Sequence, residues 1–225
     1  MVKLSLKRRT LIGIILNFLI FFITVFAMFW QIAFRGNAGP LGDFGSGFSS
    51  LLTFTNESNI LCALISLLLA LIGINNLIKK DYNISHSLKV LQLIGTTVVF
   101  LTFTVVLVFL TPLYATKTGN LFALFSDSML FTHFLTPLLA VLTFVFFTPS
   151  ESKITLRDNF LILTPIVLYG IVYLINVVFL KTWPDFYNFT LGGHPEFVPL
   201  VFTIILAASF GLARLLIIAE KKSNS

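Results

Sequence analysis

The stretch that opens the second apolar run, residues 52–59, reads Leu52-Thr53-Phe54-Thr55-Asn56-Glu57-Ser58-Asn59. Six of its eight side chains are polar or ionisable, and the apolar run behind it is long enough to cross a membrane. Polar groups at such a place are costly without partners, so they are candidates for function. The structural alternative is that the same side chains cap the helix and bind neighbouring helices through hydrogen bonds.

Helical spacing sorts these side chains into two faces. Glu57 falls about 200° around an ideal helix from Thr55, so it cannot join Thr55 in one site without a break in the helix. Lipid offers no hydrogen-bond partners, so the small polar side chains that share the face of Thr55 are expected to point into a helix bundle. These side chains are Thr55, Ser58, Asn59, Cys62 and Ser66.

The composition of the 225-residue chain is that of an integral membrane protein. Hydrophobic residues make up 57% of it, charged residues only 11%, and the mean hydropathy is +0.98. No ordinary soluble domain has this composition. The net charge of +6 does not indicate nucleic-acid binding, because the Lys and Arg residues lie mostly between apolar runs, where they set membrane orientation. The single cysteine excludes an intramolecular disulfide.

The apolar runs predict an all-α, polytopic membrane bundle that takes in residues 1–225 as one domain. The first run exceeds the roughly 7–15 apolar residues of a signal peptide, so a retained anchor is expected. Its Asn17, Thr24 and Gln31 recur at every seventh position, which indicates a bundle-facing stripe. A closed β-barrel would need strands of about ten residues with alternating polarity. The six predicted spans are 11–33, 48–76, 88–112, 128–148, 159–180 and 197–219.

Positive charge predicts the orientation of these spans. With the N-terminus inside, the inner segments hold 12 Lys and Arg residues and the outer loops hold 3. This excess places both termini in the cytoplasm. The start of the second span and the start of the fourth then lie at the same, outer face.

His133 lies one to two turns into the fourth span, at the depth expected for Thr55. Pro137 lacks an N–H, so the carbonyl of His133 loses its normal helical partner and the helix is expected to bend. His133 is then either a neutral bundle histidine bonded to another helix or a functional residue, as a general base or a ligand group. His86 lies at the inner side, so no cluster of ligands for a metal is expected, and we predict no cofactor.

The fifth span brings Tyr173 and Asn176 to a level similar to that of His133. They are expected either to form interhelical hydrogen bonds within an aromatic belt or to orient His133 and contact a lipid head group. His194 is expected to be a solvated loop residue. Three residues of the same loop are interpreted as interfacial anchors: Trp183, Pro184 and Tyr187.

Short motifs in this chain resemble those of one family. They are Phe54-Thr55-x-x-Ser58-Asn59, His133-x-x-x-Pro137-Leu138-Leu139 and Trp183-Pro184. The chain looks like the bacterial six-helix membrane proteins called "Pr-six-Pr", which are related to the eukaryotic androgen-induced FAR-17a type proteins. The resemblance implies a multi-pass protein of a bacterial cell membrane.

The resemblance also implies an activity, because the eukaryotic members hydrolyse fatty-acid esters of hydroxy fatty acids with a membrane Thr and His. By this analogy Thr55 is the nucleophile and His133 its base, with a membrane lipid or fatty-acyl ester as substrate. Such a pair is chemically reasonable, since a Thr hydroxyl needs an adjacent base. Cys62 is an alternative nucleophile, about two turns deeper. The side chains expected to bind or orient the substrate are Ser58, Asn59, Tyr173 and Asn176.

Two other classes of function stay open at this point. The first is a non-catalytic lipid-binding or transport protein that uses the same groups for a head group. The second is a structural subunit that binds a partner protein. An enzyme requires Thr55 and His133 to converge at a pocket, whereas a transporter is expected to show a broken helix or inverted repeats.

Cysteine labelling tests the orientation. In a Cys62→Ala background, we expect Asn120→Cys to react with a membrane-impermeant maleimide on intact cells, because the charge excess places residues 113–127 outside. Asn83→Cys should react only after the membrane is opened. Labelling of both positions from the same side would contradict the predicted topology.

Overall fold

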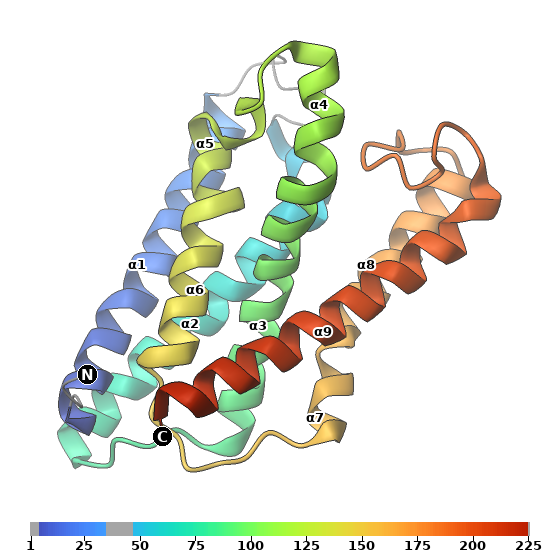
Figure 1. Ribbon diagram of the computed structural model, residues 1–225. Helices are drawn as coiled ribbons and strands as arrows, with labels where there is room; N and C mark the ends of the chain where they lie inside the picture. The colour runs from blue at the N-terminus through green and yellow to red at the C-terminus, as the bar shows by residue number, and fades with distance from the viewer. Residues whose placement is uncertain (1–4, 35–46, 225) are drawn as a thin grey trace.

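The structure, a computed structural model, describes residues 5–34 and 47–224. Within these residues the secondary structure is helical, and six helices are long and apolar enough to cross a membrane. The predicted all-α, multi-pass fold is therefore confirmed, while the sidedness of the termini stays a prediction. Figure 1 shows both termini at one end of the molecule. The six spans are Leu6–Ala33, Phe54–Lys79, His86–Thr116, Asp127–Phe146, Leu156–Phe179 and Pro195–Ser223.

Side-chain caps determine where the first spans begin. Helix α1 (Leu6–Ala33) starts after Ser5, whose hydroxyl accepts a hydrogen bond from the backbone N–H of Arg8. Helix α2 (Phe54–Lys79) starts after Thr53, which has extended backbone angles and caps it in the same way. The predicted start at residue 48 was wrong because this extended residue interrupts the helix. The segment before it forms a short 3-10 helix, η2 (Gly47–Leu52).

Two spans contain a wider, π-helical turn immediately before a Thr-Pro pair. In the fourth span the N–H of Thr136 bonds to the carbonyl of Phe131, five residues back. Pro137 has no N–H and its ring crowds the preceding turn, so a wider turn accommodates it, as one also does before Pro112. His133 lies inside this turn. The elements are α3 (His86–Val105), η3 (Val106–Leu110), α4 (Thr111–Thr118), η4 (Ala123–Phe125), α5 (Asp127–Leu130), η5 (Phe131–Leu135) and α6 (Thr136–Phe146).

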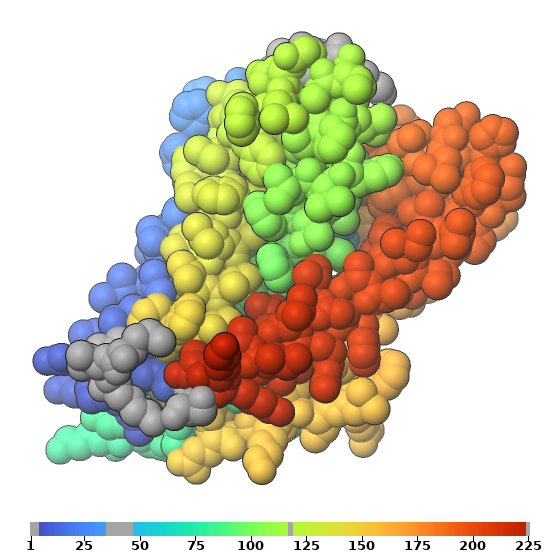
Figure 2. Space-filling view, in the orientation of Figure 1, coloured from blue at the N-terminus to red at the C-terminus, as the bar shows by residue number. Residues whose placement is uncertain are grey.

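The last two spans lean away from the other four. Figure 1 shows α8 and α9 diverging from the bundle toward the end opposite the termini. In the space-filling view the orange and red atoms lean to one side but still adjoin the green ones (Figure 2). Near the termini, α9 packs against α3 and α6, and α8 packs mainly on α9. The elements of this pair are α7 (Leu156–Leu161), α8 (Leu163–Leu174), η6 (Ile175–Phe179), η7 (Pro195–Phe197) and α9 (Val198–Asn224).

The predicted polar stripes face protein. Asn17, Thr24 and Gln31 of α1 are all buried, and the Thr24 hydroxyl lies 3.4 Å from that of Thr136 on α6. The α2 stripe of Ser58, Cys62 and Ser66 is buried as well, which confirms that expectation. Polar contacts of this kind replace the hydrophobic driving force that is missing between helices in lipid.

A buried ion pair joins two helices at the end nearest the termini. Lys89 Nζ of α3 lies 3.2 Å from Glu220 Oε1 of α9 and donates to the carbonyl of Ser152 at 2.8 Å. Only 4% of the lysine side chain and 7% of the glutamate side chain are exposed. Each charge therefore depends on the other, since an isolated buried charge is very costly.

Removing one partner of this pair tests that dependence. We expect Lys89→Met to reduce stability in detergent by about 3–5 kcal/mol, because the buried Glu220 carboxylate loses the ammonium that lies 3.2 Å from it. The double variant Lys89→Met/Glu220→Leu should recover most of this loss. Thermal unfolding followed by tryptophan fluorescence provides the measurement.

The exposed pair His194–Glu196 serves as the control, with side chains that are 61% and 63% exposed. Glu196→Ala should change stability very little. If Lys89→Met costs no more than Glu196→Ala, the interpretation of a dependent buried pair is wrong.

Candidate functional site

Thr55 lies in the first turn of α2, directly after the Thr53 cap, and its side chain is half-buried. Its carbonyl accepts hydrogen bonds from the Ser58 hydroxyl at 2.9 Å and from the Asn59 amide at 2.7 Å. Ser58 and Asn59, three and four positions further along α2, thus stabilise the backbone conformation at Thr55. The Thr55 side chain lines a small cavity between α2 and the neighbouring helices.

Tyr187, from the loop between α8 and α9, reaches this first turn. Its hydroxyl accepts a hydrogen bond from the backbone N–H of Thr55 at 3.3 Å, and the Thr55 side chain is a further partner. Burial raises the pKa of Tyr187 to about 12, although its hydrogen bonds with Thr55 act in the opposite direction. The phenol is therefore neutral at physiological pH and keeps its proton for donation.

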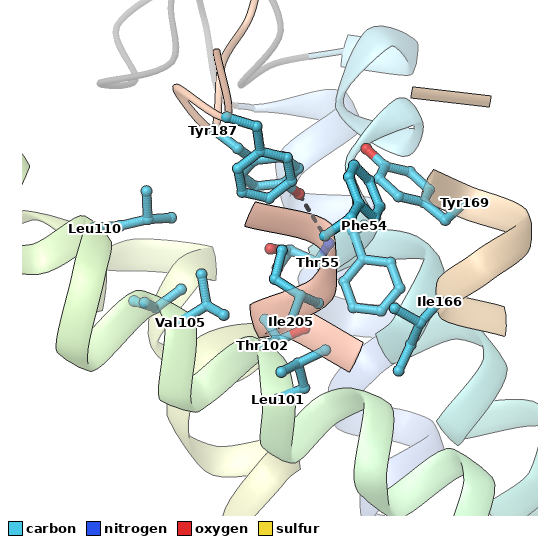
Figure 3. A pocket seen from close by; sticks show the side chains of 13 residues that line it. Phe54, Thr55, Leu101, Thr102, Val105, Leu110, Ile166, Tyr169, Tyr187 and Ile205 are labelled. Carbon is cyan, nitrogen blue, oxygen red and sulfur yellow. Dashed lines mark hydrogen bonds between the residues drawn. The ribbon is translucent and has the colours of Figure 1, made fainter. Parts of the chain in front are cut away.

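A small cavity of about 40 Å³ adjoins Thr55 (Figure 3). Its walls are almost entirely apolar and come from α2, α3, η3, α8, α9 and the loop that holds Tyr187. Thr55 and Tyr187 face each other at one side of it, and Phe54 and Tyr169 close another. The apolar lining consists of Phe54, Leu101, Val105, Val106, Leu110, Ile166, Phe189, Phe202 and Ile205.

Asn59 connects this turn to the helix that contains His133. Its side-chain nitrogen donates to the carbonyl of Thr55 and, at 3.1 Å, to the carbonyl of Thr132. The Asn59 amide therefore bonds to the backbone of both helices, so Thr55 and the π-helical turn that contains His133 lie at the same depth. The adjacent Ser58 hydroxyl lies 3.0 Å from that of Thr102 on α3. Both Ser58 and Asn59 thus join helices at the site.

His133 is buried and turned toward the short helix η4. Its Nδ1 lies 2.5 Å from the carbonyl of Leu124, and its ring meets that of Phe125 edge to face. A carbonyl only accepts, so Nδ1 carries a proton, and in the neutral form of the imidazole Nε2 is the acceptor. His133 is not among the described residues that line the cavity beside Thr55.

The loop that holds Tyr187 is built around Asp185. The Asp185 carboxylate accepts hydrogen bonds from the Tyr173 hydroxyl, from the backbone of Phe189 and from the backbone and hydroxyl of Thr190. The aromatic rings of this loop pack around the fully buried Tyr173. The Asp185 carboxylate thus fixes the position of Tyr187.

Asn176 lies at the loop's other end. Its amide donates to the carbonyl of Val172, and its side-chain oxygen accepts from the Thr182 hydroxyl. The described hydrogen bonds of Tyr173 and Asn176 therefore organise the loop. The sequence suggested either interhelical hydrogen bonds in an aromatic belt or contacts with His133 or a head group.

Sequence reasoning missed the importance of Tyr187 and Asp185. Tyr187 was expected to be an interfacial anchor, but it is buried and bonded to Thr55. One feature of the sequence could have indicated this loop. Aromatic residues surround an Asp that is followed five positions later by a Thr, in Trp183-Pro184-Asp185-Phe186-Tyr187-Asn188-Phe189-Thr190. An acceptor and a donor at that spacing can close a compact loop.

In the described part of the chain, no three or more His, Cys, Asp or Glu side chains lie close enough together to hold a metal ion. Cys62 is buried among Ile20, Val99 and Ala140 and is not among the described residues that line the cavity. His86 pairs with Asp158, and His194 is exposed in its loop, as the sequence predicted.

Comparison of the chain with protein-family models, with curated proteins and with solved structures gives no match.

The Asp185 network predicts a pH-dependent loop. Burial by itself would raise the pKa of Asp185, but hydrogen bonds from Thr190, Tyr173 and Phe189 bring it below the ordinary value. The ionised carboxylate therefore stabilises the loop above the ordinary aspartate pKa of about 4, and this stabilisation is lost as the pH falls through the lower, folded-state pKa.

We expect Trp183 fluorescence, measured in a Trp30→Phe background, to report this opening below about pH 4. The Asp185→Asn variant should show the acid-state spectrum at neutral pH. An acid transition that persists in Asp185→Asn would contradict the assignment to this carboxylate.

Proposed function

We propose that the protein binds the fatty-acyl part of a membrane lipid between α2, α3, α8 and α9, with the lipid's ester group at Thr55 and Tyr187. The observation that supports this proposal is the contact of Thr55 with the Tyr187 hydroxyl at one side of a largely apolar cavity. The hydroxyls of Thr102 and Tyr169, which also line it, donate to the carbonyls of Val98 and Leu52. Binding sites for such ligands have mostly apolar walls and a few polar groups that fix orientation.

Room for the acyl chain lies next to this cavity. A cavity of about 40 Å³ has space for only a small group such as the ester. A groove of about 320 Å³ lies on the other side of Phe54 and Tyr169, whose ring centroids are 5.1 Å apart and which line both spaces. Leu168 and Val172 line the groove and are exposed, so it opens toward the surrounding lipid.

Hydrolysis of the bound ester is a second candidate function, favoured by the protonation of His133. Since Nδ1 donates to Leu124, Nε2 is the nitrogen that can accept a proton. The Thr55 oxygen would attack the ester carbonyl carbon and pass its proton to Nε2, which then protonates the leaving alcohol. Water would hydrolyse the acyl-threonine in the reverse sense.

This reaction needs the His133 ring to reach the cavity, directly or through one water. The Tyr187 hydroxyl would be the donor to the oxyanion, because the Asn59 amide is occupied by two carbonyls. Lipid binding requires no such movement, so the geometry supports binding more directly than hydrolysis.

A matched pair of substitutions on α9 tests binding. Ile205 lines the cavity, whereas its neighbour Ile204 is 59% exposed. We expect Ile205→Trp to weaken binding of a fluorescent fatty-acyl ester in detergent at least tenfold, and Ile204→Trp to leave it unchanged. Thr55→Ala should weaken binding about fivefold through one lost hydrogen bond, and Thr55→Ser should restore it. Equal affinity in both tryptophan variants would contradict the proposal.

Turnover of a chromogenic acyl ester tests hydrolysis. If Thr55 and His133 act as one unit, Thr55→Ala, His133→Ala and the double variant should lose activity to similar extents. Folded wild-type protein that binds the ester without turning it over would remove the catalytic candidate and retain the binding proposal.

A further inference from the structure

Glu57 is the acidic residue of the first turn of α2, and it lines the groove between α2 and α8. Thr55 lines the small cavity instead, so the Phe54–Tyr169 ring pair separates the two side chains. This arrangement agrees with the sequence prediction that Glu57 and Thr55 occupy different faces of α2. The carboxylate thus belongs to the lipid-facing space and not to the interior of the bundle.

The Glu57 carboxylate has no partner within the described protein. None of the described residues donates a hydrogen bond to it or forms an ion pair with it. Its backbone N–H bonds to the carbonyl of Thr53, as the first turn of a helix requires. The described lining of the groove also contains no Lys, Arg or His: it consists of Phe54, Glu57, Ser58, Leu61, Val98, Pro165, Leu168, Tyr169 and Val172.

A carboxylate that faces an apolar groove is unfavourable unless a positive group or a hydrogen-bond donor approaches it. The first turn of a membrane span lies near the level of the lipid head groups, where such donors are found. An ammonium group offers three N–H donors and a positive charge, and hydrogen bonds between charged groups are the strong ones. A head group that carries negative charge but no ammonium would be repelled by Glu57.

We propose that the groove binds a lipid whose head group ends in a primary ammonium, with Glu57 as its counter-ion. The ammonium lies at Glu57, and the acyl chain passes along the apolar wall formed by Leu61, Val98 and Leu168. The ester region of the lipid then lies beside the Phe54–Tyr169 pair, next to Thr55. This inference rests on the proposed function in one respect, because it names the class of lipid that enters the same site.

Head-group selectivity of the purified full-length protein tests the proposal. Dioleoyl lipids with ethanolamine, choline or glycerol head groups are titrated into the protein in detergent, and retained lipid is measured by native mass spectrometry. We expect wild-type protein to retain phosphatidylethanolamine about tenfold more tightly than phosphatidylglycerol, and to prefer it over phosphatidylcholine, which has no N–H donors. Glu57→Gln should abolish both preferences.

Two further variants keep the result interpretable. Glu196→Gln, a substitution of an exposed acid outside the groove, should leave the preference for phosphatidylethanolamine unchanged. Leu168→Trp, introduced at an exposed position of the groove wall, should weaken retention of all three lipids. Wild-type protein without head-group preference, or a Glu57→Gln variant that keeps it, would overturn the inference.

Different results would contradict the proposed function and the inference on Glu57. Loss of the difference between Ile205→Trp and Ile204→Trp in acyl-ester binding would remove the ester site, while the preference that depends on Glu57 would persist. Conversely, ester binding that depends on Thr55 without any preference for an ammonium head group would remove only the inference about Glu57.

Discussion

The side-chain amide of Asn59 is the contact on which the site depends. In water, the carbonyls of Thr55 and Thr132 would have solvent as an alternative partner, but inside a membrane bundle each must be satisfied by protein. The Asn59 amide donates to both carbonyls and thereby fixes α2 against the π-helical turn of the fourth span. Gln31 and Asn56 form a similar connection between α1 and α2 at 3.2 Å. Because lipid competes for apolar contacts, such polar contacts determine which helix faces meet.

The number of spans, their order and their polar faces could be predicted from the sequence, because length and apolarity decide what crosses a membrane. The exact start of α2 could not, since it depends on the extended backbone of Thr53. The depth shared by Thr55 and His133 followed from topology. The direction of the His133 ring did not, because it depends on the carbonyl of Leu124 in a separate short helix. Sequence spacing along one helix contains no information on such a contact.

The separation of the last two spans explains why a site exists at this end of the bundle. Near the termini, α9 packs closely on α3 and α6, and apolar residues fill the space between them. Toward the other end the helices diverge (Figure 1), and the aromatic loop around Asp185 covers the space that opens. Tyr187 is therefore both a part of this cover and a partner of Thr55. The loop and the first turn of α2 form one unit, although 132 positions separate Tyr187 from Thr55 in the chain.

The buried Lys89–Glu220 pair also has a consequence for biosynthesis. Lys89 leaves the ribosome 131 residues before Glu220, which at about 5–20 residues per second is an interval on the order of ten seconds. During that interval the lysine has no buried counter-ion, so its ammonium must stay at the water-facing surface of the membrane. The start of α3 therefore reaches its final depth only after α9 has been inserted. Insertion of α9 is thus expected to complete the position of α3, so that assembly of this part of the bundle does not follow chain order.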